Sequence, residues 1–243
     1  MSLWVWANAS NYVLTGLTRV ELFIALNEQL EGQVAFMKAV DESVASDGLM
    51  DFEFIFKFLL LSPFNAGDPV WDALQPQTLP SQVIPGIEFG IKAFQRKKGD
   101  YIKVFVCSFN PQKLMPIVRR SYVHGANGVI VSIPVPDDLS FRADHVDTLK
   151  GLLGDILETN KSSIPHGTFL LLLPHDRQNH EEVEEFKAEL QALVTQIFAS
   201  YSPPQPWVFH VAAENELRKL MLEEVMPAQL LRICRDIESE TCE

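Results

Sequence analysis

Three residues at or after the ends of predicted strands have side chains suited to nucleophilic catalysis: Cys107, His175 and Asp176. Ligands of an open α/β sheet usually bind where the strands end, and a histidine can activate a cysteine thiol as a nucleophile. However, a cysteine in an apolar strand is more often a small core residue, and a His-Asp pair after a strand more often begins a turn or a helix. We therefore keep an enzyme that uses Cys107 or His175 as the less favoured alternative.

The longest apolar run leads into a loop at the position where nucleotide-binding α/β proteins hold phosphate. The run 53–61 is typical of a strand buried on both faces, and Ser62 ends it abruptly, so we predict that it is the central strand. A phosphate-binding loop needs a lysine that neutralises phosphate and then a hydroxyl that binds Mg²⁺. This chain has Gly67, Asp68 and Pro69 instead. Because Asp68 would repel phosphate, the loop lacks the expected chemistry.

The elements that would position these residues alternate along the chain. Strand-like runs cover 53–61, 86–95, 101–107, 128–133, 168–173 and 207–211, and helical periodicity covers 112–124, 140–159, 180–200 and 214–237. A short polar turn at 96–100 joins the second and third strands as a hairpin. One hairpin followed by βα units predicts a three-layer α/β fold: a six-stranded, mostly parallel sheet with one antiparallel edge strand and helices on both faces.

The first part of the chain is expected to be separate, with an N-terminal extension at 1–50 and the main domain at 51–243. Within the extension, 17–46 has the spacing of an amphipathic helix, and Thr18 with Glu21 forms a plausible capping box. Its apolar stripe consists of Val20, Phe23, Leu26, Leu30, Val34, Met37, Val40 and Val44. Two alternatives remain open: this helix packs on its own domain, or it binds a partner.

The composition limits the class of protein. The chain has 243 residues, of which 47% are hydrophobic, and a formal net charge of −12, which argues against nucleic-acid binding. No apolar run reaches the length of a membrane-spanning helix. Cys107, Cys234 and Cys242 show neither metal-site spacing nor a disulfide framework. We therefore expect no metal site and a cytoplasmic location, where thiols stay reduced.

Several stretches resemble the Rab-like small GTPases of the Ras superfamily. Residues 58–61 lead into the altered phosphate loop, and 86–92 (GIEFGIK) resembles the Rab interswitch sequence. Residues 121–131 (SYVHGANGVIV) resemble the Rab run Tyr-Tyr-Arg-Gly-Ala and the strand after it, and 137–141 resembles the opening of the next Rab helix. The resemblance covers about 53–237 and implies a Ras-like, P-loop-type fold.

The same resemblance places ten vestigial nucleotide-site positions in this chain: Ser62, Gly67, Asp68, Pro69, Ile84, Ser108, Pro111, Gln112, Asp176 and Ala213. Gln112 keeps the residue that positions water, but Ser108 replaces the acidic metal partner, and Pro111 has no N–H for the γ-phosphate. Losing the lysine and the metal ligand would weaken nucleotide binding on the order of a thousandfold or more. We predict a pseudo-GTPase with no catalytic residues and no bound cofactor. The alternative is a divergent switch that binds GTP or GDP weakly with Mg²⁺.

The segments that correspond to the GTPase switches are rich in proline, which restricts the backbone without any ligand. The prolines are Pro63, Pro69, Pro76, Pro80, Pro85, Pro111 and Pro116. We therefore predict that both switch-equivalent loops hold one arrangement, as a fixed surface for protein partners.

The resemblance also suggests where partners bind. Rab proteins present three aromatic residues to their effectors, and the matching positions are Phe89, Cys107 and Tyr122. We expect protein partners at this switch-equivalent face and at the N-terminal helix, in vesicle, cytoskeletal or ciliary trafficking. Cys242 followed by Glu243 does not form a prenylation motif, so we expect no direct membrane anchor.

Overall fold

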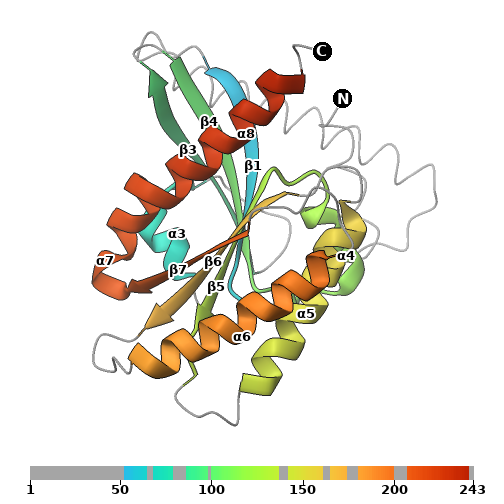
Figure 1. Ribbon diagram of the computed structural model, residues 1–243. Helices are drawn as coiled ribbons and strands as arrows, with labels where there is room; N and C mark the ends of the chain where they lie inside the picture. Colours follow the sequence, from blue (N-terminus) through green and yellow to red (C-terminus); the bar gives the residue numbers. More distant parts are fainter. Residues whose placement is uncertain are drawn as a thin grey trace, which may run out of the picture.

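A seven-stranded mixed sheet forms the centre of the protein (Figure 1). The computed structural model describes residues 52–64, 68–78, 86–97, 100–136, 142–160, 165–173, 180–199 and 207–240. The expected N-terminal extension, with its helix at 17–46, lies outside the described residues. The strands are β1 (Phe52–Leu61), β2 (Gln77–Thr78), β3 (Ile87–Lys97), β4 (Asp100–Phe109), β5 (Gly128–Pro134), β6 (His166–Leu173) and β7 (Trp207–Ala213).

Helices cover both faces of this sheet (Figure 1). They are α3 (Pro69–Leu74), α4 (Pro116–Val123), α5 (Arg142–Thr159), α6 (His180–Phe198), α7 (Glu214–Lys219) and α8 (Met226–Glu240). A 3₁₀ turn, Pro111–Lys113, precedes α4, and a π-helical segment, Leu220–Val225, joins α7 to α8. One hydrophobic cluster packs α4, α5 and α6 on one face, and a second packs α3, α7 and α8 on the other. The predicted α/β class is confirmed.

Strand β1 is the central strand, as predicted. The order β2-β3-β4-β1-β5-β6-β7 leaves three strands on each side of it, and it pairs in parallel with both β4 and β5. Phe58, Leu59 and Leu60 are fully buried because helices lie over both faces. A Cβ atom at Gly128 of β5 would lie 2.2 Å from the Phe58 ring, so only glycine leaves room for this ring.

The sheet differs from the expectation of six strands because β2 adds a seventh. Gln77 and Thr78 pair antiparallel with Ile91 and Gly90 of β3, so β2 is the edge strand and the antiparallel strand β3 lies inside it. A two-residue strand is too short to show the alternation that predicts strands. A Cβ at Gly90 would lie 2.8 Å from the Trp71 ring, which explains why glycine is needed at this close approach.

None of the helices described between residues 52 and 240 is both long and apolar enough to cross a membrane.

Candidate functional site

The candidate site lies at the carboxyl ends of β1, β4 and β5, where the loop after β1 leads into α3. Asp68 is the N-cap of α3, and its Oδ1 accepts a hydrogen bond from the backbone N–H of Val70 at 3.0 Å. Its Oδ2 accepts a hydrogen bond from Ser108 Oγ at the end of β4. Pro69, the first residue of α3, has no N–H to offer a ligand. The carboxylate therefore accepts hydrogen bonds at the start of α3 that a bound anion would otherwise accept.

Burial raises the pKa of Asp68 above its ordinary value of 3.8, although several hydrogen bonds oppose this shift. The donors are the Ser108 and Ser62 hydroxyls and the backbone N–H groups of Trp71 and Val70. Removal from water destabilises the ionised carboxylate, and hydrogen bonds to it restore part of that loss. The hydrogen-bond donors around this site are thus already bonded to the carboxylate of Asp68, a group of the chain itself.

Two serines complete this network at the next strand. Ser62, directly after β1, places its Oγ 2.7 Å from Ser132 Oγ on β5, and Ser132 Oγ also donates to the Leu61 carbonyl at 3.4 Å. Both serine side chains are buried. The sequence-predicted positions Ser62, Asp68 and Ser108 are therefore brought together, and they bond to one another.

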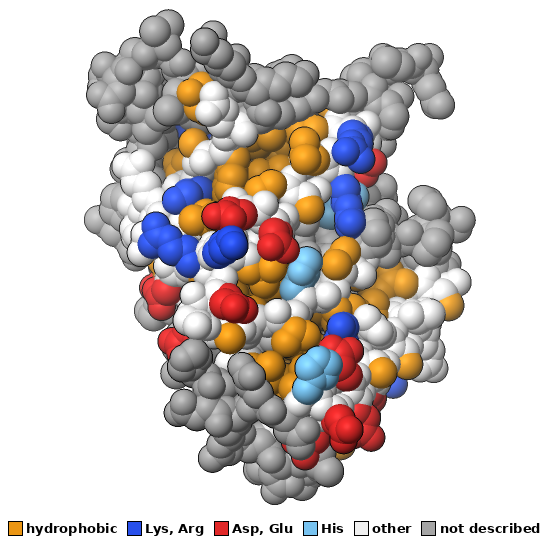
Figure 2. Space-filling view, turned by 60° about the vertical axis from the view of Figure 1, so that its left-hand side comes forward, with side chains coloured by type: hydrophobic (Ala, Val, Ile, Leu, Met, Phe, Trp, Pro, Cys, Tyr) orange, Lys and Arg blue, Asp and Glu red, His pale blue; other side chains and the backbone are white. Residues whose placement is uncertain are grey.

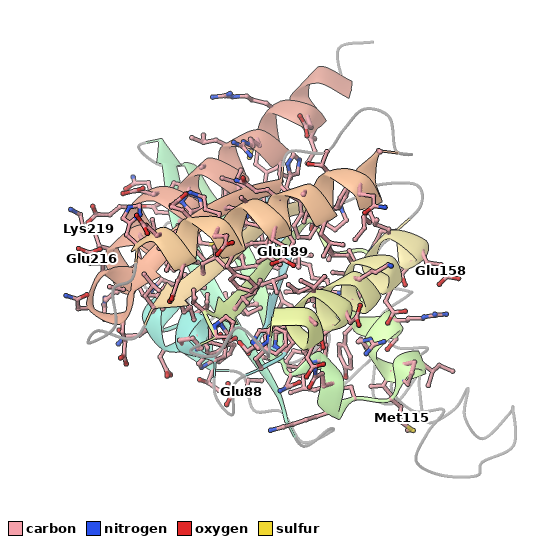
Figure 3. All side chains as sticks on the ribbon, turned by 60° about the horizontal axis from the view of Figure 1, so that its bottom comes forward. Glu88, Met115, Glu158, Glu189, Glu216 and Lys219 are labelled. Atoms are coloured by element: carbon pink, nitrogen blue, oxygen red, sulfur yellow. The ribbon has the colours of Figure 1, made fainter. Side chains whose placement is uncertain are left out.

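The surroundings of Asp68 are acidic. Burial raises the pKa of the Glu88 carboxyl, with further contributions from the charges of Asp68 and Asp72. Figure 3 shows Glu88 beside α3 at this edge of the sheet. Acidic side chains gathered around this site repel an incoming polyphosphate. Among the residues that the structure describes, no group of three His, Cys, Asp or Glu side chains is arranged to hold a metal ion.

The polar groups of residues 110–112, directly after β4, form hydrogen bonds within the protein. Asn110 caps the 3₁₀ turn by accepting from the Gln112 backbone N–H at 2.9 Å. The Gln112 side-chain amide donates to Thr148 Oγ1 on α5 at 3.2 Å, and the Pro111 carbonyl accepts from Arg119 Nη1 at 3.1 Å. Gln112, the position expected to orient water, is thus directed to α5.

Helix α4 is tied to α5 by ion pairs that the sequence analysis did not identify. Arg119 Nη2 pairs with Asp155 Oδ2, and Arg120 Nη2 lies 3.1 Å from Asp155 Oδ1 and 3.1 Å from Glu158 Oε2. The Asp155 side chain is only 11% exposed. We call Arg119, Arg120 and Asp155 the α4–α5 clamp. Because one buried carboxylate accepts from two guanidinium groups, the clamp restrains the middle of α4.

A buried lysine holds the C-terminal end of α4. Lys57 Nζ on β1 donates to the His124 carbonyl at 2.7 Å, just beyond the last residue of α4. Desolvation lowers the pKa of Lys57 from 10.5 to about 7. The buried Asn160 amide accepts from Gly125 N–H at 3.0 Å and donates to the Val123 carbonyl. The middle and the C-terminal end of α4 are therefore held by side chains from other elements.

The three positions predicted to contact partners lie together, but they differ in exposure. Phe89 pairs with Cys107 across β3 and β4, and its ring centre lies 5.8 Å from that of Tyr122. Cys107 is 0% and Tyr122 3% exposed, whereas Phe89 is half-buried. Burial also raises the pKa of the Cys107 thiol to about 12, so Cys107 is not available as a nucleophile.

The exposed apolar side chains of this region lie at the start of α4. Met115 is 51% and Ile117 59% exposed, and Figure 3 shows Met115 pointing away from the body of the protein. Leu114 beside them packs partly into the core. Phe89, Met115 and Ile117 form what we call the α4 apolar surface. Sequence reasoning had found Phe89 but missed Met115 and Ile117.

Of the remaining predicted positions, the structure describes Ala213, which is the last residue of β7 and the N-cap of α7 and makes no side-chain cap bond. The others lie outside the described residues: Gly67, Ile84, His175 and Asp176.

Comparison with known proteins gives no match: no protein-family model matches the chain, and no curated protein matches it.

Proposed function

We propose that the chain is a pseudo-GTPase: a Ras-like, Rab-type domain that binds little or no nucleotide and acts as a protein-interaction module. The repeated βα units and the two helical layers support the Ras-like part of the proposal, because β2 aside, the sheet has the six strands that the resemblance implies. The setting implied by the resemblance is intracellular trafficking or cytoskeletal machinery in the cytoplasm.

The observation that carries this proposal is the position of Asp68. It stands where a phosphate-binding lysine is required, and it accepts the Val70 N–H and Ser108 hydroxyl. A nucleotide phosphate would have to displace this carboxylate and overcome the charges of Glu88 and Asp72. Each lost charge-assisted hydrogen bond costs about 1.5 to 3 kcal/mol. The residues at this site therefore disfavour nucleotide binding.

The restraints on α4 support a fixed rather than a switching surface. GTPase switches work because loops order around the γ-phosphate and loosen after hydrolysis. Here the α4–α5 clamp and Lys57 hold the middle and the C-terminal end of α4 through contacts within the chain. We propose that the α4 apolar surface binds a protein partner in this single arrangement.

The partner of this surface is proposed to be a protein rather than a nucleic acid. The formal net charge of the chain is −12, which disfavours contact with a phosphate backbone. On the side drawn in Figure 2, which is the left-hand side of Figure 1 and not that of α4, Lys and Arg side chains are interspersed with Asp and Glu. Exposed apolar residues such as Met115 and Ile117 are typical of protein-binding surfaces. The N-terminal helix is the second proposed contact region.

Nucleotide binding is tested by calorimetric titration of GTP and of GDP, with Mg²⁺, into protein freed of nucleotide by mild unfolding and refolding. We expect no heat and no thermal shift at millimolar nucleotide. Binding at micromolar concentration would refute the pseudo-GTPase and favour the weak GTP-binding switch.

Partner binding is tested by proximity labelling in cells with wild-type protein and Ile117→Asp. The matched control is Leu231→Asp, which adds the same charge at a 43%-exposed apolar position on α8, on the opposite face of the sheet. We expect Ile117→Asp to lose a specific set of labelled proteins that Leu231→Asp retains. Equal sets for both variants would contradict the proposed surface.

A further inference from the structure

One end of the sheet extends beyond the α4, α5 and α6 layer. Strand β5 pairs with β1 only from Phe58 onward, so the first part of β1 and its partners in β4 and β3 project past it. In Figure 1 these strands reach beyond α4, α5 and α6 at the top of the view. Helices α4, α5 and α6 therefore do not reach over this projecting sheet end.

Strand register places the side chains of this end on known faces. Ile55 of β1 pairs with Lys103 of β4, which pairs with Ala93 of β3. Side chains alternate along a strand, so Ile55 lies on the same face as Leu59, the face covered by α4. Phe105 pairs with Lys57 in the next row on this face, which lies between Ile55 and the core.

The α4 layer ends just before this row. The Lys57 side chain, two residues after Ile55, reaches the His124 carbonyl that follows α4. Ile55 is 58% exposed, Ala93 is exposed, and Phe105 is half-buried. Lys103 in the same row is buried, and desolvation lowers its pKa. The exposed side chains of the row, Ile55 and Ala93, are therefore apolar.

The chain itself supplies a segment that can cover this row. Five residues, 47–51, separate the predicted helix 17–46 from Phe52, the first residue of β1. The six Cα–Cα steps from 46 to 52 span at most about 22 Å, so the last turns of this helix cannot lie far from the projecting sheet end. A short connection of this kind raises the effective concentration to about the millimolar range, which favours this segment over a separate partner.

The apolar stripe of the segment also suits the row. Val34, Met37, Val40 and Val44 lie on one side of the predicted helix over its last turns. This stripe matches the exposed apolar side chains of Ile55 and Ala93.

We propose that residues 34–46 pack as a helix against Ile55 and Phe105 on the chain's own sheet, so that the segment completes the α4 side of the fold. The first half of the apolar stripe, from Val20 to Leu30, then remains for a partner. This inference does not depend on the pseudo-GTPase proposal, because it uses only the sheet end and the connection to β1.

The direct test is a cross-linking experiment on the full chain. Ile55→Cys is combined with Met37→Cys, on the apolar stripe, or with Ala39→Cys, which lies on the opposite side of the predicted helix. Cys242→Ser is included in both proteins, since Cys107 and Cys234 are buried. With a short thiol-specific cross-linker, we expect the Met37→Cys protein to form an intramolecular product at least tenfold faster. Equal rates, or products joining two molecules only, would overturn the proposal.

A second measurement keeps the test independent of cross-linking geometry. In the Ile55→Cys protein, the rate of thiol labelling should rise at least threefold when Met37→Asp is added. The matched change Ala39→Asp adds the same charge and should leave the rate unchanged. If neither substitution alters the rate, or both alter it equally, residues 34–46 do not cover Ile55.

Discussion

Replacing Lys57 by methionine should change the pH dependence of stability in a way that reports on its burial. Lys57 is only 8% exposed, and desolvation lowers its pKa to about 7, against 10.5 for an ordinary lysine. Methionine has a similar length, carries no charge and adapts to irregular apolar sites. The substitution also removes the hydrogen bond from Nζ to the His124 carbonyl.

The sign follows from the protons bound in each state. Between pH 7 and 10.5 the unfolded chain keeps a proton on Lys57 that the folded protein has released, so the stability of the wild type rises with pH in this window. The pKa difference makes the wild type about 2 kcal/mol more stable at pH 9 than at pH 7 through this group alone. Loss of the hydrogen bond costs roughly 1 to 3 kcal/mol at either pH.

Urea unfolding of wild type and Lys57→Met at pH 7 and pH 9 measures this difference. We expect the variant to compare more favourably with the wild type at pH 7 than at pH 9, by about 2 kcal/mol. Lys219→Met, at an exposed position of α7, is the control for removing one positive charge. The same difference between wild type and Lys57→Met at both pH values would refute the reasoning.

Three further predictions concern the candidate site. Asp68→Ala should lower the free energy of unfolding by about 2 to 4 kcal/mol, because α3 loses its cap and a hydroxyl loses its acceptor. Asp68→Asn keeps a capping oxygen and should lose less in urea unfolding; equal losses would count against the cap. Asp155→Ala breaks the α4–α5 clamp and should speed amide exchange across α4 at least tenfold, with α6 as the unchanged reference; unchanged exchange in α4 would show that the clamp does not restrain it. The buried Cys107 thiol, with its pKa raised to about 12, should resist thiol reagents at pH 8 in the native protein; rapid native labelling of Cys107 would contradict its packing.

The long elements of the fold could be predicted because their patterns are continuous. The apolar run 53–61 became β1, Phe52–Leu61, and the period in 180–200 became α6, His180–Phe198. Strand β2 could not be predicted, since two residues show no period and its pairing depends on contacts with β3. The start of α4 also moved, from the predicted 112 to Pro116, because a 3₁₀ turn intervenes.

The hydrogen bonds of the candidate site could not be predicted from the sequence. The sequence predicts that Asp68 repels phosphate, which stays a prediction, but its bond with Ser108 joins residues 40 positions apart and has no local signal. The partners Arg119 and Asp155, 36 positions apart, were missed for the same reason. Lys57 did leave a signal, because a lysine inside a buried apolar run requires a hydrogen-bond acceptor.

The short strand β2 has a consequence for aggregation and for strand exchange. An open edge strand offers a row of free backbone groups on which another chain can grow a cross-molecular sheet. Gln77 and Thr78 already pair with Ile91 and Gly90 in the middle of the β3 edge. Trp71 and Pro76 lie close to Gly90. A second chain would have to expel β2 before it could extend the sheet past this point. Strand β2 therefore interrupts the β3 edge and shortens the stretch along which a second chain could add.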